Sequence, residues 1–158
     1  MPTTLEEAVR DFLAQKRIAV AGVSRRKSEA ANAIYKKLRG AGYRVFATNP
    51  KAEEVEGDAC YPDLASIPGG VDGVVVATPP AAAEEIVRQC HELGVSRVWM
   101  HRSFGEGSVS QRAVDYCREN GIAVIPGACP MMFCEPVDFG HKCVRFLVRL
   151  SGGMPAPD

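Results

Sequence analysis

A short turn near the start of the chain brings together a glycine, a hydroxyl group and three cations. Its residues are Gly22, Val23, Ser24, Arg25, Arg26 and Lys27. Glycine lets the backbone approach a ligand closely, and a serine hydroxyl can donate to a phosphate oxygen. Because the start of a helix is the positive end of its dipole, three cations there are unfavourable unless an anion binds. The turn therefore indicates a phosphate-binding loop, with an ordinary solvated turn as the alternative.

A further cation, Lys51, follows a predicted strand in the sequence Asn49-Pro50-Lys51. A domain that binds NAD would place Asp or Glu near this position to hold the ribose hydroxyls. The G-x-G-x-x-G fingerprint is also absent, because the first turn contains only Gly22. A lysine favours a phosphate on the ribose instead, as in NADP or coenzyme A. No G-x-x-x-x-G-K-[ST] sequence occurs, so ATP bound in that manner is not expected.

The hydrophobic pattern that must position these residues alternates between strand and helix. Unbroken apolar runs predict buried parallel strands, and amphipathic stretches between them predict helices on both faces of the sheet. The five strands are expected at residues 18–23, 43–48, 71–77, 97–100 and 122–125. This alternation predicts an α/β, Rossmann-like three-layer domain with right-handed crossovers, a five-stranded parallel sheet and strand order 3-2-1-4-5.

The ends of the chain carry further expectations. Residues 1–150 are expected to form one domain, and residues 151–158 a disordered tail. A last helix is expected after Asp138, and Trp99 is expected in the core. The apolar residues of that helix expected to face inward are Phe139, Cys143, Phe146, Leu147 and Leu150.

Composition excludes several classes of protein. Of 158 residues, 46% are hydrophobic, which is enough for a core, and 19 Lys and Arg balance 19 Asp and Glu. That balance argues against non-specific binding of nucleic acid. No apolar run approaches the roughly 20 residues of a membrane span, and the N-terminus is too acidic for a signal peptide. We therefore expect a cytoplasmic protein with no nucleic-acid or membrane partner.

The cysteines raise two chemical possibilities, although most of the six are expected to be small buried hydrophobes. Cys129, Cys134, His141 and Cys143 are close enough in sequence to suggest zinc. A helix would point His141 and Cys143 in different directions, however, which disfavours a metal site. Cys129 is also a candidate nucleophile, which would need His101 or His141 as its base, or a thiol that forms a disulfide with a ligand thiol.

Four segments of the chain carry a resemblance to a known family. They are IAVAGVSRR at the first turn, VFATNPK at the second strand, VDGVVVATPP at the third strand and IPGACP after the fifth. They resemble the small stand-alone CoA-binding domain proteins, which are similar to the N-terminal domain of the succinyl-CoA synthetase alpha subunit. The resemblance runs from about Arg17 to Pro130, and it implies coenzyme A as the cofactor.

The resemblance also implies a role for each of the loops. The turn of residues 22–27 would hold the CoA phosphates through backbone groups and the serine hydroxyl, with its three cations in support. Asn49 and Pro50 would line the adenosine, and Lys51 would meet the nucleotide's phosphate. The segment that would pack along the diphosphate and pantetheine consists of Ala77, Thr78 and Pro79.

Near the thiol end of CoA, the resemblance matches Cys129 with a cysteine of the synthetase. The synthetase has asparagine just before that cysteine, whereas this chain has Ala128. Its second alpha domain, with a phosphorylated histidine, and its ATP-binding beta subunit have no counterpart in these 158 residues. Ligase activity is therefore not expected.

These observations favour a protein that binds CoA or acyl-CoA, with no demonstrated catalysis of its own. The alternatives are an NADP-linked reductase, an acyl-CoA enzyme that uses Cys129, and a purely structural or interaction module. Hydride transfer needs a substrate pocket, which usually comes from a second domain, so the reductase is disfavoured. The apolar stretch of residues 131–133 would either cover the pocket or form a contact in a homodimer or with a protein partner.

Overall fold

The computed structural model describes residues 2–26, 29–102, 107–135, 137, 139–152 and 154–155. Its strands are β1 (Arg17–Ala21), β2 (Arg44–Thr48), β3 (Glu54–Val55), β4 (Asp58–Tyr61), β5 (Gly73–Val76), β6 (Arg97–Met100) and β7 (Ala123–Pro126). Its helices are α1 (Leu5–Leu13), α2 (Ala30–Gly40), α3 (Pro80–Glu92), α4 (Gln111–Glu119), the short 3-10 helix η1 (Pro130–Met132) and α5 (Phe139–Leu150). No helix within these residues is long and apolar enough to span a bilayer.

The strands form one twisted sheet in the order β3-β4-β2-β1-β5-β6-β7. All neighbouring strands are parallel except β3, which pairs antiparallel with β4. The expected five strands in the order 3-2-1-4-5 were wrong in number and in order. The strand expected third, now β5, pairs with β1 on the side away from β2, and β4 occupies the place beyond β2.

Two missed strands, β3 and β4, explain the error in number, and β4 explains the error in order. Residues 58–61 read Asp-Ala-Cys-Tyr inside a charged stretch, and only Cys60 is buried, so no apolar run marks a strand there. Backbone pairing with β2 makes the strand instead, through Ala47 opposite Cys60 and Thr48 opposite Tyr61. With β4 counted as the third parallel strand, the parallel strands run 3-2-1-4-5-6, which is the order of a Rossmann-like domain.

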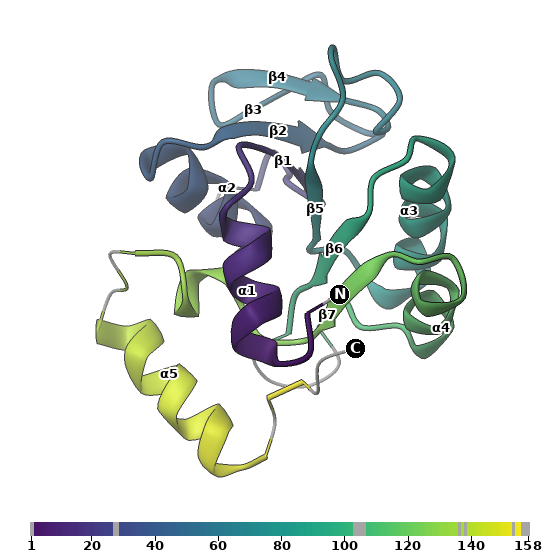
Figure 1. Ribbon diagram of the computed structural model, residues 1–158. Coiled ribbons are helices and arrows are strands. Elements are labelled where there is room, and N and C mark those ends of the chain that lie inside the picture. Colours follow the sequence, from purple (N-terminus) through teal and green to yellow (C-terminus); the bar gives the residue numbers. More distant parts are fainter. Residues whose placement is uncertain are drawn as a thin grey trace.

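Helices cover both faces of the sheet, as the apolar strand runs predict. In Figure 1, α1, α2 and α5 lie on one side and α3 and α4 on the other, and each side encloses its own apolar cluster. Trp99 is fully buried, as predicted, and its ring meets Phe12 edge-on at 5.4 Å between centroids. Met132 in η1 is also fully buried, so this part of the apolar stretch 131–133 belongs to the core rather than to a solvent-exposed contact.

The last helix presents the opposite face from the one expected. Phe146, Leu147 and Leu150 are 62%, 54% and 70% exposed, and Cys143 is exposed as well. Val148 is buried instead. The helix carries two apolar rows, and periodicity cannot say which of them meets the core. The side chain of Phe139 and the placement of Asp138 lie outside the described residues, as do residues 153 and 156–158 of the expected tail.

Candidate functional site

Three loops meet at the carboxyl edge of the sheet, as their strands predict. The amide of Gly22, after β1, donates to the carbonyl of Thr48 at the end of β2 (3.0 Å). The amide of Ala77, after β5, donates to the carbonyl of Ala21 (2.9 Å). These two bonds hold the segments 22–26, 48–51 and 77–79 side by side. This edge is where Rossmann-like domains bind their ligands.

Gly22 is the point where the first and third loops touch. Its φ is +103°, and a Cβ built on it would lie 2.3 Å from the carbonyl oxygen of Ala77 and 3.2 Å from Cγ2 of Thr78. A backbone oxygen at that distance leaves no room for any side chain. Glycine is therefore required here both for its conformation and for the close approach of the two loops.

The first loop is held from below by Asn32, a residue that the sequence did not single out. Asn32 is fully buried in α2, and its Oδ1 accepts from the amide of Ser24 (3.0 Å) while its Nδ2 donates to the carbonyl of Ser24 (2.7 Å). These two bonds occupy the amide and the carbonyl of Ser24. The backbone of Ser24 is therefore not available for the phosphate contact that the family resemblance implies. Val23 is fully buried, whereas Arg25 is exposed and its amide donates no hydrogen bond within the described residues, so the amide of Arg25 is open to an anion.

The side chains around this loop carry charges of both signs, with two arginines on the loop itself and Glu29 at the start of α2. Arg25 and Arg26 are exposed, and the Ser24 hydroxyl accepts from the amide of Arg26 (3.1 Å). Lys27 lies outside the described residues. Helix α2 begins after Glu29 with no side-chain cap and no acidic residue in its first turn. An uncapped helix start beside two exposed arginines favours a bound anion.

Asn49 ties the second loop to the first. Its Nδ2 donates to the carbonyl of Val23 (3.0 Å), and its Oδ1 accepts from the amide of Lys51 (2.9 Å). Both ends of the amide are therefore engaged within the protein, so Asn49 shapes the two loops. Pro50 and Lys51 are exposed, and no ion pair of Lys51 occurs among the described residues. The Lys51 ammonium is available to a ligand phosphate.

The hairpin of β3 and β4 completes this side of the site. Its turn residue Glu56 has a φ of +50° and accepts from Nδ2 of Asn32 (2.9 Å). Asp58, at the start of β4, accepts from the Tyr35 hydroxyl (2.6 Å) and from Arg39 (2.7 Å). These bonds hold the pKa of Asp58 below its ordinary value. Helix α2 therefore anchors the hairpin as well as the first loop.

The third loop leads into α3. Ala77 and Thr78 are half-buried, Pro79 is exposed, and the Thr78 hydroxyl donates to the carbonyl of Pro79 (3.1 Å). Pro80 occupies the first helical position, where its missing N–H costs nothing, and the helix has no side-chain cap. The side chains of this loop are short, so they leave room beside Gly22 for an extended ligand to pack along the loop.

Cys129 lies further along the same edge, after β7, which is two strands beyond β5. It is 3% exposed and precedes η1, and it follows Ala128, whose φ is +62°. Asparagine, the residue of the synthetase at this position, tolerates that conformation better than alanine does. Burial lowers the pKa of His101, after β6, so a neutral imidazole is favoured there. Five of the six cysteines are buried, as predicted, and Cys143 is the exception.

The described residues contain no group of three His, Cys, Asp or Glu side chains placed to hold a metal ion. Cys129 and Cys134 are buried and Cys143 is exposed. The zinc hypothesis therefore finds no support in the part of the chain that the structure describes.

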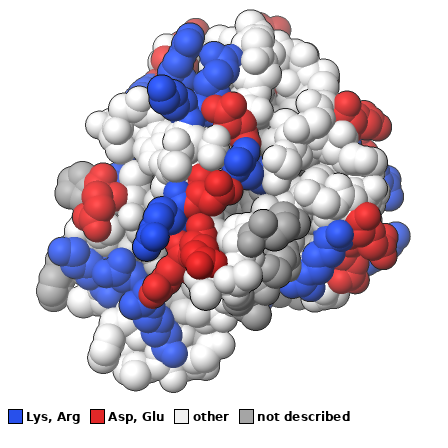
Figure 2. Space-filling model, in the orientation of Figure 1, with Lys and Arg blue, Asp and Glu red and all other residues white. Residues whose placement is uncertain are grey.

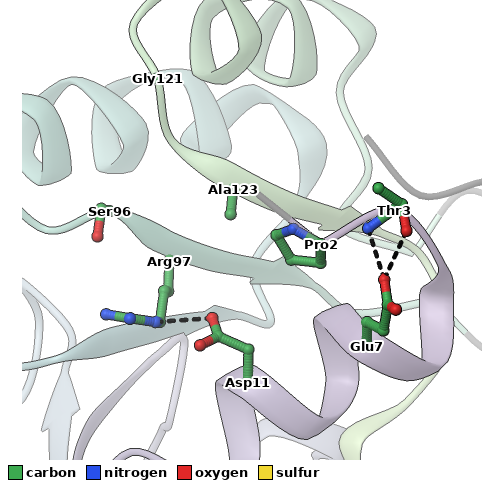
Figure 3. Close-up of a pocket in the computed structure, with 8 residues that line it drawn as sticks. All are labelled: Pro2, Thr3, Glu7, Asp11, Ser96, Arg97, Gly121 and Ala123. Atoms are coloured by element: carbon green, nitrogen blue, oxygen red, sulfur yellow. Dashed lines mark hydrogen bonds and ion pairs between the residues drawn. The ribbon is translucent and has the colours of Figure 1, made fainter.

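A hollow of about 710 Å³ lies at the opposite, amino-terminal edge of the sheet (Figure 3). Its charged groups already have partners: Nε of Arg97 meets Asp11 at 2.8 Å, and Glu7 accepts from Thr3 (2.8 Å) and caps α1. The three loops converge at the carboxyl edge instead, and hydrogen-bond donors without a partner among the described residues lie there. We therefore place the candidate site at the carboxyl edge.

Figure 2 shows cations and carboxylates interspersed over much of one face of the molecule, without a broad cationic surface.

Fold and site together define a Rossmann-like domain whose carboxyl edge suits a phosphate-bearing nucleotide. A family model described as CoA binding domain matches residues 16–135. The chain therefore belongs to this family of CoA-binding domains, and the resemblance seen in the sequence is confirmed.

Individual relatives agree with that assignment. The chain is 36% identical over 75 residues to an ADP-forming acetate–CoA ligase I of Archaeoglobus fulgidus, a match that covers 48% of the chain and 11% of the ligase. It is 28% identical to the protein YneT of Bacillus subtilis, over 72% of the chain and 82% of YneT. A solved hypothetical protein from Pyrococcus horikoshii OT3 matches with a TM-score of 0.76 and 31% identity, over 84% of this chain and 91% of that one.

The chain spans only a small part of the ligases that it matches. The shares are 11% and 18% of the two Archaeoglobus fulgidus ligases.

Proposed function

We propose that this chain binds coenzyme A, free or as an acyl thioester, at the carboxyl edge of its sheet and acts as a binding protein. The observation that carries the proposal is the convergence of three loops around Gly22 in a chain of the CoA-binding family. The open amide of Arg25 suits the diphosphate, and the exposed Lys51 suits the phosphate on the ribose.

The same geometry orders the ligand along the sheet. The adenosine end would lie over β2 and Pro50, the diphosphate over β1, and the pantetheine along Ala77, Thr78 and Pro79. The thiol would then point toward the ends of β6 and β7, where Cys129 is. Because Cys129 is 3% exposed, a role in lining this end fits better than a role as a freely reacting nucleophile.

Calorimetric titration with CoA, dephospho-CoA, NADP and NAD tests the proposal. We expect CoA to bind more tightly than dephospho-CoA, and Lys51→Ala to abolish that difference. Losing one charge-assisted contact costs about 1.5–3 kcal/mol, or roughly ten- to a hundredfold in affinity. Lys16→Ala is the matched control, because Lys16 is an exposed lysine at the opposite edge of the sheet and should leave both affinities unchanged.

Other outcomes would select the other hypotheses. Tighter binding of NADP than of CoA would favour the reductase, and no nucleotide binding would favour a structural module. The homodimer or protein partner, the cytoplasmic location, the single domain of residues 1–150 and the disordered tail of residues 151–158 stay predictions. Size-exclusion chromatography with light scattering would test the homodimer.

A further inference from the structure

The ends of β6 and β7 lie beside the proposed thiol end and carry a cation that the proposed function does not use. The amide of Arg102, just after β6, donates to the carbonyl of Ala128 (2.9 Å), and the two residues form an isolated antiparallel bridge. Ala128 directly precedes Cys129. Arg102 is therefore fixed next to the residue that the family resemblance places near the thiol.

The guanidinium of Arg102 rests against the backbone of the β7 loop. A Cβ built on Gly127 would lie 3.2 Å from Nη2 of Arg102 and 3.4 Å from its Nε. The carbonyl of Gly127 accepts from the Trp99 indole (2.9 Å), which fixes that loop to the core. The Arg102 side chain is thus half-buried against a fixed support rather than extended into solvent.

Within the described residues, Arg102 differs from the other half-buried arginines because its guanidinium has no hydrogen-bond or ion-pair partner. Arg17 donates to the carbonyl of Gly70 (2.8 Å), Arg97 pairs with an aspartate (2.8 Å), and Arg145 donates to the carbonyl of Met132 (2.9 Å). Among the described residues, the guanidinium of Arg102 makes no hydrogen bond or ion pair. A guanidinium that is held in place and has no acceptor within the protein is available to bind an anion.

The guanidinium nitrogens are also within reach of a ligand. No side-chain nitrogen or oxygen in the described part of the chain is both fully buried and without a hydrogen-bond partner. The unpartnered nitrogens of Arg102 are therefore not sealed off from solvent. The planar fork of a guanidinium matches a carboxylate, which it can bind through two parallel hydrogen bonds.

The order of the strands says which anion this is. The phosphates of CoA are already assigned to the loops after β1 and β2, and β6 lies two strands beyond β1, roughly 10 Å away at the usual spacing. The pantetheine arm, which the proposed function lays between the phosphates and this end of the edge, carries no charge. An anion at Arg102 is then part of the acyl group.

We propose that Arg102 binds a carboxylate at the far end of the acyl group, so that the ligands of this site are CoA thioesters of short dicarboxylic acids. This inference rests on the proposed function and names the class of its ligand. The neutral His101 beside Arg102 adds no competing charge.

Binding of matched thioesters tests the inference. Malonyl-, succinyl- and glutaryl-CoA are each compared with the neutral thioester of equal carbon number, which is propionyl-, butyryl- or valeryl-CoA. We expect at least one carboxylated thioester to bind ten- to a hundredfold more tightly than its neutral counterpart. Arg102→Gln should remove that difference and leave the affinity for free CoA unchanged, which also shows that the variant is folded.

Two further variants sharpen the test. Arg112→Gln changes an 82% exposed arginine of α4 and should keep the preference. Arg102→Lys should keep only part of it, because an ammonium lacks the planar fork. If CoA binds but every carboxylated thioester binds no better than its neutral counterpart, the inference is overturned and the proposed function survives. If CoA itself does not bind, both are overturned.

Discussion

Gly22 shows how one residue without a side chain brings two loops of the site together. Its φ of +103° is unfavourable for other residues, and the Ala77 carbonyl occupies the place of a Cβ. Gly42, with a φ of +95°, has a similar conformation but no atom within 4 Å of such a Cβ. A side chain at Gly22 would meet both backbone strain and a clash, whereas a side chain at Gly42 would meet strain alone. Comparing substitutions at the two positions therefore separates the two contributions to stability.

We expect Gly22→Ala to lower the free energy of unfolding by about 2–4 kcal/mol, since strain and a clash with backbone both act there. Gly42→Ala should cost only the strain, about 1–2 kcal/mol. Urea-induced unfolding of the two variants measures both values. Equal losses would mean that the close approach of the two loops is not tight.

Asn32 shows what single-residue reasoning misses. In sequence it is a polar residue among alanines near the start of a helix, where a solvent-facing position is the ordinary interpretation. In the structure it is fully buried and bonds to Ser24 and to Glu56. What identifies Asn32 as important is that two separate segments of the chain satisfy the hydrogen bonds of its buried amide group. Those bonds can be recognised only in the folded structure.

Among the elements, α5 presents the clearest choice between two apolar rows. Val148 is buried and Val144 packs partly against the core, whereas Phe146, Leu147 and Leu150 are exposed. Arg145 confirms this orientation, because it donates to the carbonyl of Met132 and lies over the Phe133 ring at 5.7 Å.

A pair of truncations on α5 checks that orientation. Val148→Ala should lower the free energy of unfolding by about 1.5–3 kcal/mol, because it leaves a cavity in the core. Leu147→Ala should change it by no more than about 0.5 kcal/mol, since the side chain is 54% exposed. Thermal or urea unfolding of both variants distinguishes them. A larger loss for Leu147→Ala would mean that the exposed row is covered.

The hairpin of β3 and β4 is a second element that depends on long-range contacts. Two residues of β3 and four of β4 are too short to show a strand period. Contacts from Tyr35 and Arg39 to Asp58 anchor the hairpin on α2. The same helix holds the loop of residues 22–26 through Asn32, so the hairpin and that loop share one support.

For the whole molecule, the site bridges the ends of several strands that are distant in sequence. A ligand that binds only when these loops are assembled must stabilise the native state by linkage. At a CoA concentration of about one hundred times Kd, the gain is about 2.7 kcal/mol. For a chain of this size, that gain corresponds to a rise in Tm of roughly 5–10 °C.

Differential scanning calorimetry with and without CoA measures this rise. NAD at the same concentration is the control and should raise Tm less, because it lacks a phosphate for Lys51. An unchanged Tm at saturating CoA would argue against a site that spans these loops.

The sequence by itself predicted the α/β alternation, five of the seven strands that the structure describes and the meeting of three loops at one edge of the sheet. Those features follow from local hydrophobic period and turn chemistry, which neighbouring residues specify. The tertiary structure alone decided that β4 lies beyond β2, that α5 turns Val148 inward, and that Asn32 is buried. It also decided that Arg102 alone among the half-buried arginines has no partner within the described residues. Each of these features depends on which distant segment supplies a hydrogen bond or an apolar contact. The hydrophobic pattern of neighbouring residues does not specify that distant segment.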